Sequence, residues 1–156
     1  MSAGSADFAR WENVIEAANA AFERQDDAKA LVLYEQAIAL ARQILESKPW
    51  SKAGEQADAR LSVFDASVAA FVVSHHNAAN LHKRNGKTED VAALYRQTHR
   101  TVSDLSIAPD LEDDLRAIAA RHITRTLGEF TYHLQSRAAL MPASPGPLDA
   151  SKRRSH

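Results

Sequence analysis

Histidine is the residue type with which this sequence could most readily do chemistry. The chain holds seven histidines in 156 residues. Imidazole and carboxylate groups bind Zn²⁺ and similar divalent metals. His122 and His133 are nearly eclipsed on an expected helix with Glu129 on the same side, which could begin such a site. However, two helical turns, about 10 Å, separate His122 from Glu129, and no His-x-x-x-His or Glu-x-x-His pair occurs. We therefore expect no metal and no cofactor, and histidines at the core edge that hydrogen-bond across helices.

Catalytic residue patterns are absent from the sequence. Ser74 precedes His75 and His76, but neighbours on a helix point apart. There is no Gly-rich phosphate loop, nucleophile elbow or paired-carboxylate motif. The acid pairs 26–27 and 113–114 are expected at helix starts, where carboxylates act as caps. We expect that the protein is not an enzyme.

Charge and apolar runs limit the other function classes. The formal net charge is −1, which argues against nonspecific binding to nucleic acid or to an anionic membrane. The N-terminus has no basic start followed by an apolar run, so a secretory signal is not expected. The longest mostly apolar run, residues 66–73, is far shorter than the roughly 20 residues of a spanning helix. We expect a soluble cytoplasmic protein.

Few helix breakers occur in the body of the chain, which predicts an all-α fold. The chain has five Gly and five Pro, and three of the Pro lie after residue 141. Apolar spacings of three and four residues predict helices over about 5–24, 27–47, from 51–55 to 84, 88–105 and 110–140. Residues 1–141 would form one domain. Residues 142–156 are rich in Pro and Ser and are expected to be a flexible tail. Its basic run Lys152–Arg154 could contact nucleic acid or an acidic partner, although such short tails usually only aid solubility.

The expected helices carry distinct packing faces. Trp50 is expected to fold back over the end of the second helix, and Thr88 and Asp110 to cap the last two. A short turn at 84–87, where Gly86 tolerates φ > 0, makes its two helices antiparallel neighbours. The third helix would pack through Leu61, Phe64, Val68, Phe71, His75, Ala78 and His82. The fifth helix would pack through Leu111, Leu115, Ile118, Ala119, Ile123, Leu127, Phe130 and Leu134. Whether the third helix is continuous is left open.

An internal repeat relates two of the expected hairpins. Leu-Tyr-x-Gln occurs at 33–36 and again at 94–97, each time in the helix that follows a polar turn. A small or apolar residue, Ala30 or Val91, precedes the tyrosine by four. These residues resemble the tetratricopeptide repeat. Phe22, Ala30, Tyr34 and Ala37 match that pattern in the first copy, and Gly86, Tyr95 and the pair Ala78–Ala79 match in the second. Asp26–Asp27 replaces the turn Gly of the first copy. In the second, His82 replaces the aromatic residue, and Val91 and Thr98 replace two Ala. The copies are also about sixty residues apart, where roughly 34 is usual.

The resemblance implies stacked tetratricopeptide-like antiparallel helical hairpins, closed by a C-terminal capping helix, with a groove for a peptide or partner protein. In that family the groove is lined by the first helix of each pair. The corresponding positions here are Asn13, Glu16, Ala20 and Glu23 in the first pair, and Val73, His76, Asn80, Lys83 and Arg84 in the second. The second group is positive and could bind an acidic peptide or a C-terminal carboxylate. Alternatively, these are solvated residues at a helix end, where Lys and Arg favour the negative end of the helix dipole.

Three functions follow from this interpretation. The first is an adaptor or chaperone-like module that binds a peptide or partner protein. The second is a small-molecule or metal-responsive protein that uses the histidine-lined seam. The third is a purely structural homo-oligomer, because exposed apolar faces at the ends of a short stack call for a cap or a second copy, as in a homodimer.

Overall fold

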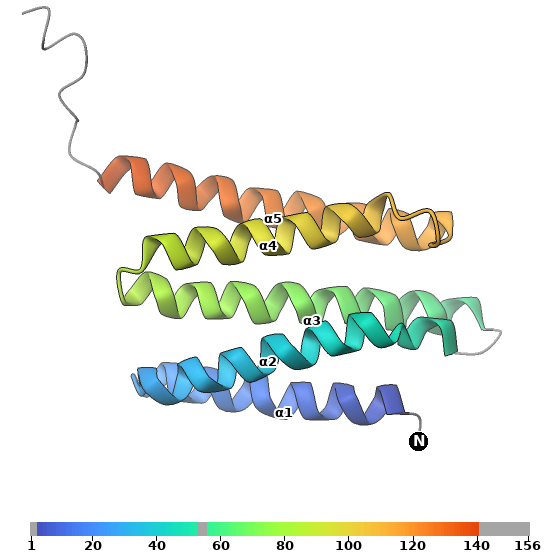
Figure 1. Cartoon of the computed structure of the whole chain (residues 1–156), viewed down its shortest axis with the longest axis horizontal. Coiled ribbons are helices and arrows are strands. Elements are labelled where there is room, and N and C mark those ends of the chain that lie inside the picture. Colours follow the sequence, from blue (N-terminus) through green and yellow to red (C-terminus); the bar gives the residue numbers. More distant parts are fainter. Residues whose placement is uncertain (1–2, 53–55, 141–156) are drawn as a thin grey trace, which may run out of the picture.

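The residues that the structure describes, 3–52 and 56–140 of a computed structural model, are almost entirely α-helical. They form α1 (Ala3–Glu23), α2 (Asp27–Ser47), the 3₁₀ helix η1 (Pro49–Lys52), α3 (Ala57–Arg84), α4 (Thr88–Ser106) and α5 (Asp113–Leu140). Consecutive α-helices run antiparallel and stack in chain order (Figure 1). The expected all-α fold of about five helices is confirmed, and no strand occurs in these two ranges. The predicted tail, 142–156, lies outside the described residues.

The central element of the stack is α3, a continuous helix of 28 residues. It contacts its sequence neighbours α2 and α4, and it also contacts α1 and α5. The first, third and fifth helices therefore meet on one side of the stack. The expectation that the last helix closes the stack is confirmed, because α5 packs on both α3 and α4.

Two apolar clusters hold α3 in place, one toward each end. Toward the η1 end, Trp50 packs its ring edge-on against Phe64, with centroids 4.9 Å apart. Trp50, which was expected to fold back over the end of α2, thus packs on α3, in a cluster that Leu45 of α2 also contacts. The rest of this cluster comes from α3, α4, α5 and the segment before α5, and includes Val68, Val72, Val102, Leu111, Leu115, Ile118 and Ala119. Toward the other end, the cluster joins α1, α2 and α3 and includes Ile15, Ala18, Ala21, Ala30, Tyr34, Ala37, Ala78 and Leu81.

The two hairpins turn in the same way. Gly86, between α3 and α4, has φ 70°, and Gln25, between α1 and α2, has φ 61°. The interval from Gln25 to Gly86 equals that from Tyr34 to Tyr95, so the repeat in sequence is also a repeat in backbone shape. In the first turn a residue with a side chain takes the conformation that glycine adopts freely, at some conformational cost.

Both tyrosines of the repeat are buried. Tyr34 and Tyr95 are 2% and 1% exposed. Tyr34 lies in α2 and packs against α1 and α3, while Tyr95 lies in α4 and packs against α3 and α5. Each tyrosine therefore fills the space between its own hairpin and the next helix, as the repeat predicts.

The predicted helix starts were less accurate. Thr88 was expected as the N-cap of α4, but Lys87 occupies that position and makes no side-chain cap bond. Asp110 does not cap α5, which begins at Asp113; its carboxylate instead contacts Lys48 at 3.3 Å. The third helix begins at Ala57, slightly later than predicted.

The predicted packing face of α5 is wrong in its second half. Leu127 and Leu134 are 48% and 46% exposed, whereas Thr126 and His133 are buried. The buried side is set by α4. Thr126 lies 3.1 Å from His99 Nδ1, and the His133 ring packs 5.5 Å from that of Tyr95. The contacts of Thr126 and His133 with α4 therefore leave Leu127 and Leu134 on the side of α5 that faces solvent.

Candidate partner-binding groove

An open, mostly apolar groove lies between α1 and α3. Its volume is about 300 Å³, and its walls are Phe8, Trp11, Glu12, Ala66, Ala69, Ala70 and Val73. On α3, alanines line this side of the helix, and their short side chains leave space beside the larger rings of α1. Its size is at the lower end of the range for ligand pockets, which suits an anchoring side chain of a peptide.

The groove is held open by polar contacts between α1 and the neighbouring helices. The Trp11 indole N–H donates to Ser74 Oγ at 2.7 Å, which fixes the orientation of the ring at the groove. Farther along α1, Asn19 Oδ1 accepts hydrogen bonds from the Tyr34 hydroxyl at 2.7 Å and from the Asn77 amide at 3.1 Å. Burial raises the pKa of Tyr34 to about 12, so its hydroxyl stays protonated as the donor. These bonds fix the relative position of α1, α2 and α3.

Lys83 and Arg84, both predicted to bind a partner, turn to opposite sides of α3. The Lys83 ammonium lies 5.1 Å from the centre of the Tyr95 ring in α4. The Arg84 guanidinium lies 3.8 Å from the centre of the Phe22 ring and donates to the Phe22 carbonyl at 2.8 Å. It also pairs with Asp27. Both cations therefore contact other helices of the same chain, and Arg84 fastens α3 to the end of the first hairpin.

His76, also predicted at the partner surface, is buried at 8% exposure. Its ring packs edge-on to that of Tyr95 with centroids 5.1 Å apart, and its Nε2 has no hydrogen-bond partner among the described residues. The interval from Ile15 to His76 is that of the repeat, so the imidazole fills the core position held by isoleucine in the first hairpin. Burial, followed by the charge of Arg125, lowers the pKa of His76 to about 4. His76 is neutral near pH 7 and faces the core.

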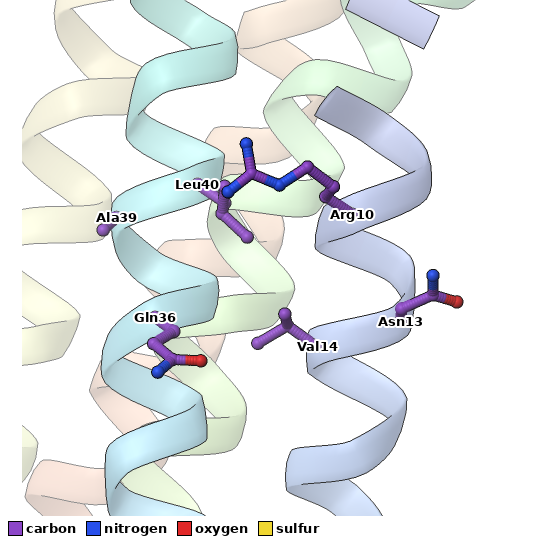
Figure 2. Close-up of a pocket in the computed structure, with 6 residues that line it drawn as sticks. All are labelled: Arg10, Asn13, Val14, Gln36, Ala39 and Leu40. Atoms are coloured by element: carbon purple, nitrogen blue, oxygen red, sulfur yellow. The ribbon is translucent and has the colours of Figure 1, made fainter. Parts of the chain in front are cut away.

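Asn13 and Glu16 are both exposed on α1, but they face different surroundings. Asn13 lines a second pocket, of about 400 Å³, with Arg10, Val14, Gln36, Ala39 and Leu40. Figure 2 shows Val14, Gln36 and Arg10 reaching into the space between α1 and α2, while the Asn13 amide points away from α2. Glu16 follows Glu12 by one helical turn and so lies along the α1–α3 groove.

Of the six predicted site residues, Glu16, Asn80 and Arg84 lie on the facing sides of α1 and α3, and Arg84 contacts Phe22 of α1 there. Asn80 is exposed and follows Val73 by two turns of α3. Of the groove walls, only Val73 was predicted to line a groove. One sequence signal could have found them, namely the run 66–73, whose alanines fall outside the regular apolar stripe of α3. Partner binding at all six residues remains a prediction.

The histidines join helices to each other. His122 Nε2 lies 2.6 Å from Asp65 Oδ1, linking α5 to α3, and His99 contacts Thr126 between α4 and α5. These two contacts confirm the expected hydrogen bonds across helices for His122 and His99, whereas the His75 ring contacts the Phe71 carbonyl of its own helix. Glu129 is exposed, whereas His133 is buried against Tyr95. Among the described residues, no three His, Asp or Glu side chains gather as a metal-binding group.

Comparison with known proteins places this chain in a family. The chain belongs to the family described as "protein of unknown function (DUF2753)", whose model matches residues 9–143. Searches of curated proteins and of solved structures gave no significant match. Within 3–52 and 56–140, no helix has both the length and the apolarity to cross a membrane.

Proposed function

We propose that this protein is a cytoplasmic adaptor that binds a peptide segment of a partner protein in the α1–α3 groove. The observation that carries the proposal is the apolar groove itself, in which Trp11 is oriented by Ser74. The resemblance to tetratricopeptide hairpins supports it, because in that family the first helix of each pair lines the groove. Here α1 and α3 are those first helices.

The charge beside the groove selects the kind of peptide. Glu12 lines the groove, and Glu16 and Glu23 continue the same side of α1. Lys83 and Arg84 were expected to attract an acidic partner. They instead lie against aromatic rings of the same chain. A peptide with an apolar anchor followed by Lys or Arg therefore complements the groove better than an acidic one does.

A bulky side chain in the groove is expected to abolish peptide binding. Ala69→Phe would fill the space between α1 and α3 without disturbing a buried core position. Ala93→Phe, at an exposed site on α4, is the matched control. Labelled peptides selected from a random library on the full chain would be titrated by fluorescence anisotropy. We expect Ala93→Phe to bind like the unmodified protein and Ala69→Phe to bind about tenfold more weakly or worse, a loss of about 1.4 kcal/mol or more. Equal peptide affinity of the two variants would refute peptide binding in this groove.

Self-association is a second candidate function, favoured by one observation. Leu127 and Leu134 lie two turns apart on α5 and are about half exposed, with the partly buried Phe130 between them. An unpaired apolar face of this kind is a typical protein–protein contact. We propose that α5 pairs with α5 of a second copy. Light scattering should then show a dimer that Leu127→Glu with Leu134→Glu converts to a monomer. A monomer mass at every concentration of the unmodified protein would exclude this pairing.

A further inference from the structure

An acidic edge runs along α1 beside the groove. Glu12, Glu16 and Glu23 are all exposed, and spacings of four and seven residues place them on one side of the helix. The ion pairs within residues 3–52 and 56–140 use other carboxylates, those of Asp27, Asp65, Asp110, Glu112, Asp113 and Asp114. The three glutamates make none of these ion pairs, so they present negative charge next to an apolar groove.

The sequence that follows α5 carries the opposite charge. Residues 141–156 contain Lys152, Arg153 and Arg154 and a single acid, Asp149. The segment leaves α5 at Leu140, at the end of the stack where the α1–α2 turn also lies (Figure 1). Glu23 is the last residue of α1 and lies at that same end. The segment that carries the basic run therefore leaves α5 at the end of the molecule where the acidic edge also ends.

Chain length permits the two charged segments to meet. Twelve residues from Leu140 to Lys152 can span up to about 40 Å when extended. Only α3 separates α5 from α1 on this side of the stack, so the distance across is about 20 Å at typical helix spacings. From Glu23 to Glu12 along α1 is about 16 Å. The basic run can therefore reach every glutamate of the edge without strain.

We propose that residues 141–156 bind in the α1–α3 groove of their own chain, with Lys152–Arg154 against the acidic edge. This inference rests on the groove assigned in the proposed function, and it names the first occupant of that groove. A tethered segment competes at an effective concentration of order millimolar. A partner peptide must therefore displace the segment. The free protein is autoinhibited, and only cationic ligands of high affinity occupy the groove.

A spin label at the end of the segment tests this directly. The chain has no cysteine, so Ser155→Cys gives a single attachment site for a nitroxide. The two tryptophan indole N–H signals are internal reporters. Trp11 lines the groove, whereas Trp50 is buried beside Phe64 in the cluster toward the η1 end. We expect the nitroxide to broaden the Trp11 signal strongly and that of Trp50 less.

Charge reversal supplies the matched controls. Glu12→Lys with Glu16→Lys changes two exposed residues and should restore a sharp Trp11 signal. Adding Lys152→Glu, Arg153→Glu and Arg154→Glu to that variant should bring the broadening back, because the charges again complement each other. Helical content measured by circular dichroism would confirm that each variant folds.

Three results would overturn the inference: a sharp Trp11 signal in the labelled protein, broadening that survives the Glu→Lys changes, or equal broadening when labelled chains are mixed with unlabelled isotope-enriched chains. The last result would make a second copy the occupant. If the segment stays away while library peptides still bind, this inference fails and the proposed function stands. If Ala69→Phe leaves peptide binding intact, the proposed function fails.

Discussion

Acidification from pH 7.5 to pH 5 is expected to lower the free energy of unfolding by about 4 kcal/mol through two adjacent buried histidines. Burial is the main cause that lowers the pKa of both His75 and His76 to about 4, whereas an unfolded histidine titrates near 6.5. Between these values the unfolded chain binds more protons than the folded chain. Stability is therefore highest above pH 6.5 and falls as pH drops toward 4, by about 1.4 kcal/mol per pH unit for each histidine.

The structural cause of this sensitivity is the environment of the two rings. His75 is fully buried, and its Nδ1 lies 2.7 Å from the Phe71 carbonyl in the same helix, so this nitrogen carries the donated hydrogen. His76 packs against Tyr95 and has the positive charges of Arg125 and Lys83 nearby. A proton on either ring would bring an unpaired charge into the seam between α3 and α4.

Urea denaturation at pH 7.5 and pH 5 measures this effect, and His76→Phe provides the control. The phenyl ring keeps the edge-on contact with Tyr95 but cannot be protonated. We expect the variant to lose about half of the acid sensitivity, because only His75 remains. Exposed ion pairs such as Arg60–Asp114 titrate equally in both proteins, so their contribution cancels. Identical pH dependence in the two proteins would contradict the assignment.

Tyr95→Ala is expected to lower the free energy of unfolding by about 3–5 kcal/mol, the usual cost of deleting a buried aromatic ring. The Tyr95 ring contacts His76 at 5.1 Å, His133 at 5.5 Å and Phe130 at 6.3 Å between ring centroids. It is therefore the common contact of α3, α4 and the second half of α5. Because all three rings pack on Tyr95, deletion of its side chain leaves a cavity between α3, α4 and α5.

Hydrogen exchange locates the damage caused by Tyr95→Ala. We expect faster exchange in α5 beyond Thr126 and unchanged protection in α1, which has its own cluster around Tyr34. Tyr95→Phe retains the ring and should cost about 1 kcal/mol or less. Loss of protection that is confined to the first hairpin would show that Tyr95 does not hold α5.

Local sequence signals predicted the helices and the central contact of each hairpin. The polar break at Asp26–Asp27 and Pro49 delimited α2 correctly as Asp27–Ser47, because caps and breakers act on the few residues beside them. The paired motifs around Tyr34 and Tyr95 indicated two similar hairpins, and both rings are buried.

Local sequence signals did not predict the features that depend on contacts between distant helices. Spacing alone placed Leu127 and Leu134 in the core, but helical periodicity does not say which side faces α4. There the His99–Thr126 and Tyr95–His133 contacts determine the orientation. Likewise, Arg84 looked like a free cation at a helix end, and its position over Phe22 depends on a helix some sixty residues earlier. The groove was hard to predict for the same reason, because its walls come from two helices distant in sequence.

Residue-resolved NMR of the full chain with a library-selected cationic peptide tests most directly whether the α1–α3 groove binds a peptide. We predict that the peptide shifts the methyl signals of Ala66, Ala69 and Val73 and the indole N–H of Trp11, while Trp50 stays unchanged. Shifts confined to Val14, Ala39 and Leu40 would place binding in the α1–α2 pocket instead and would contradict the proposal.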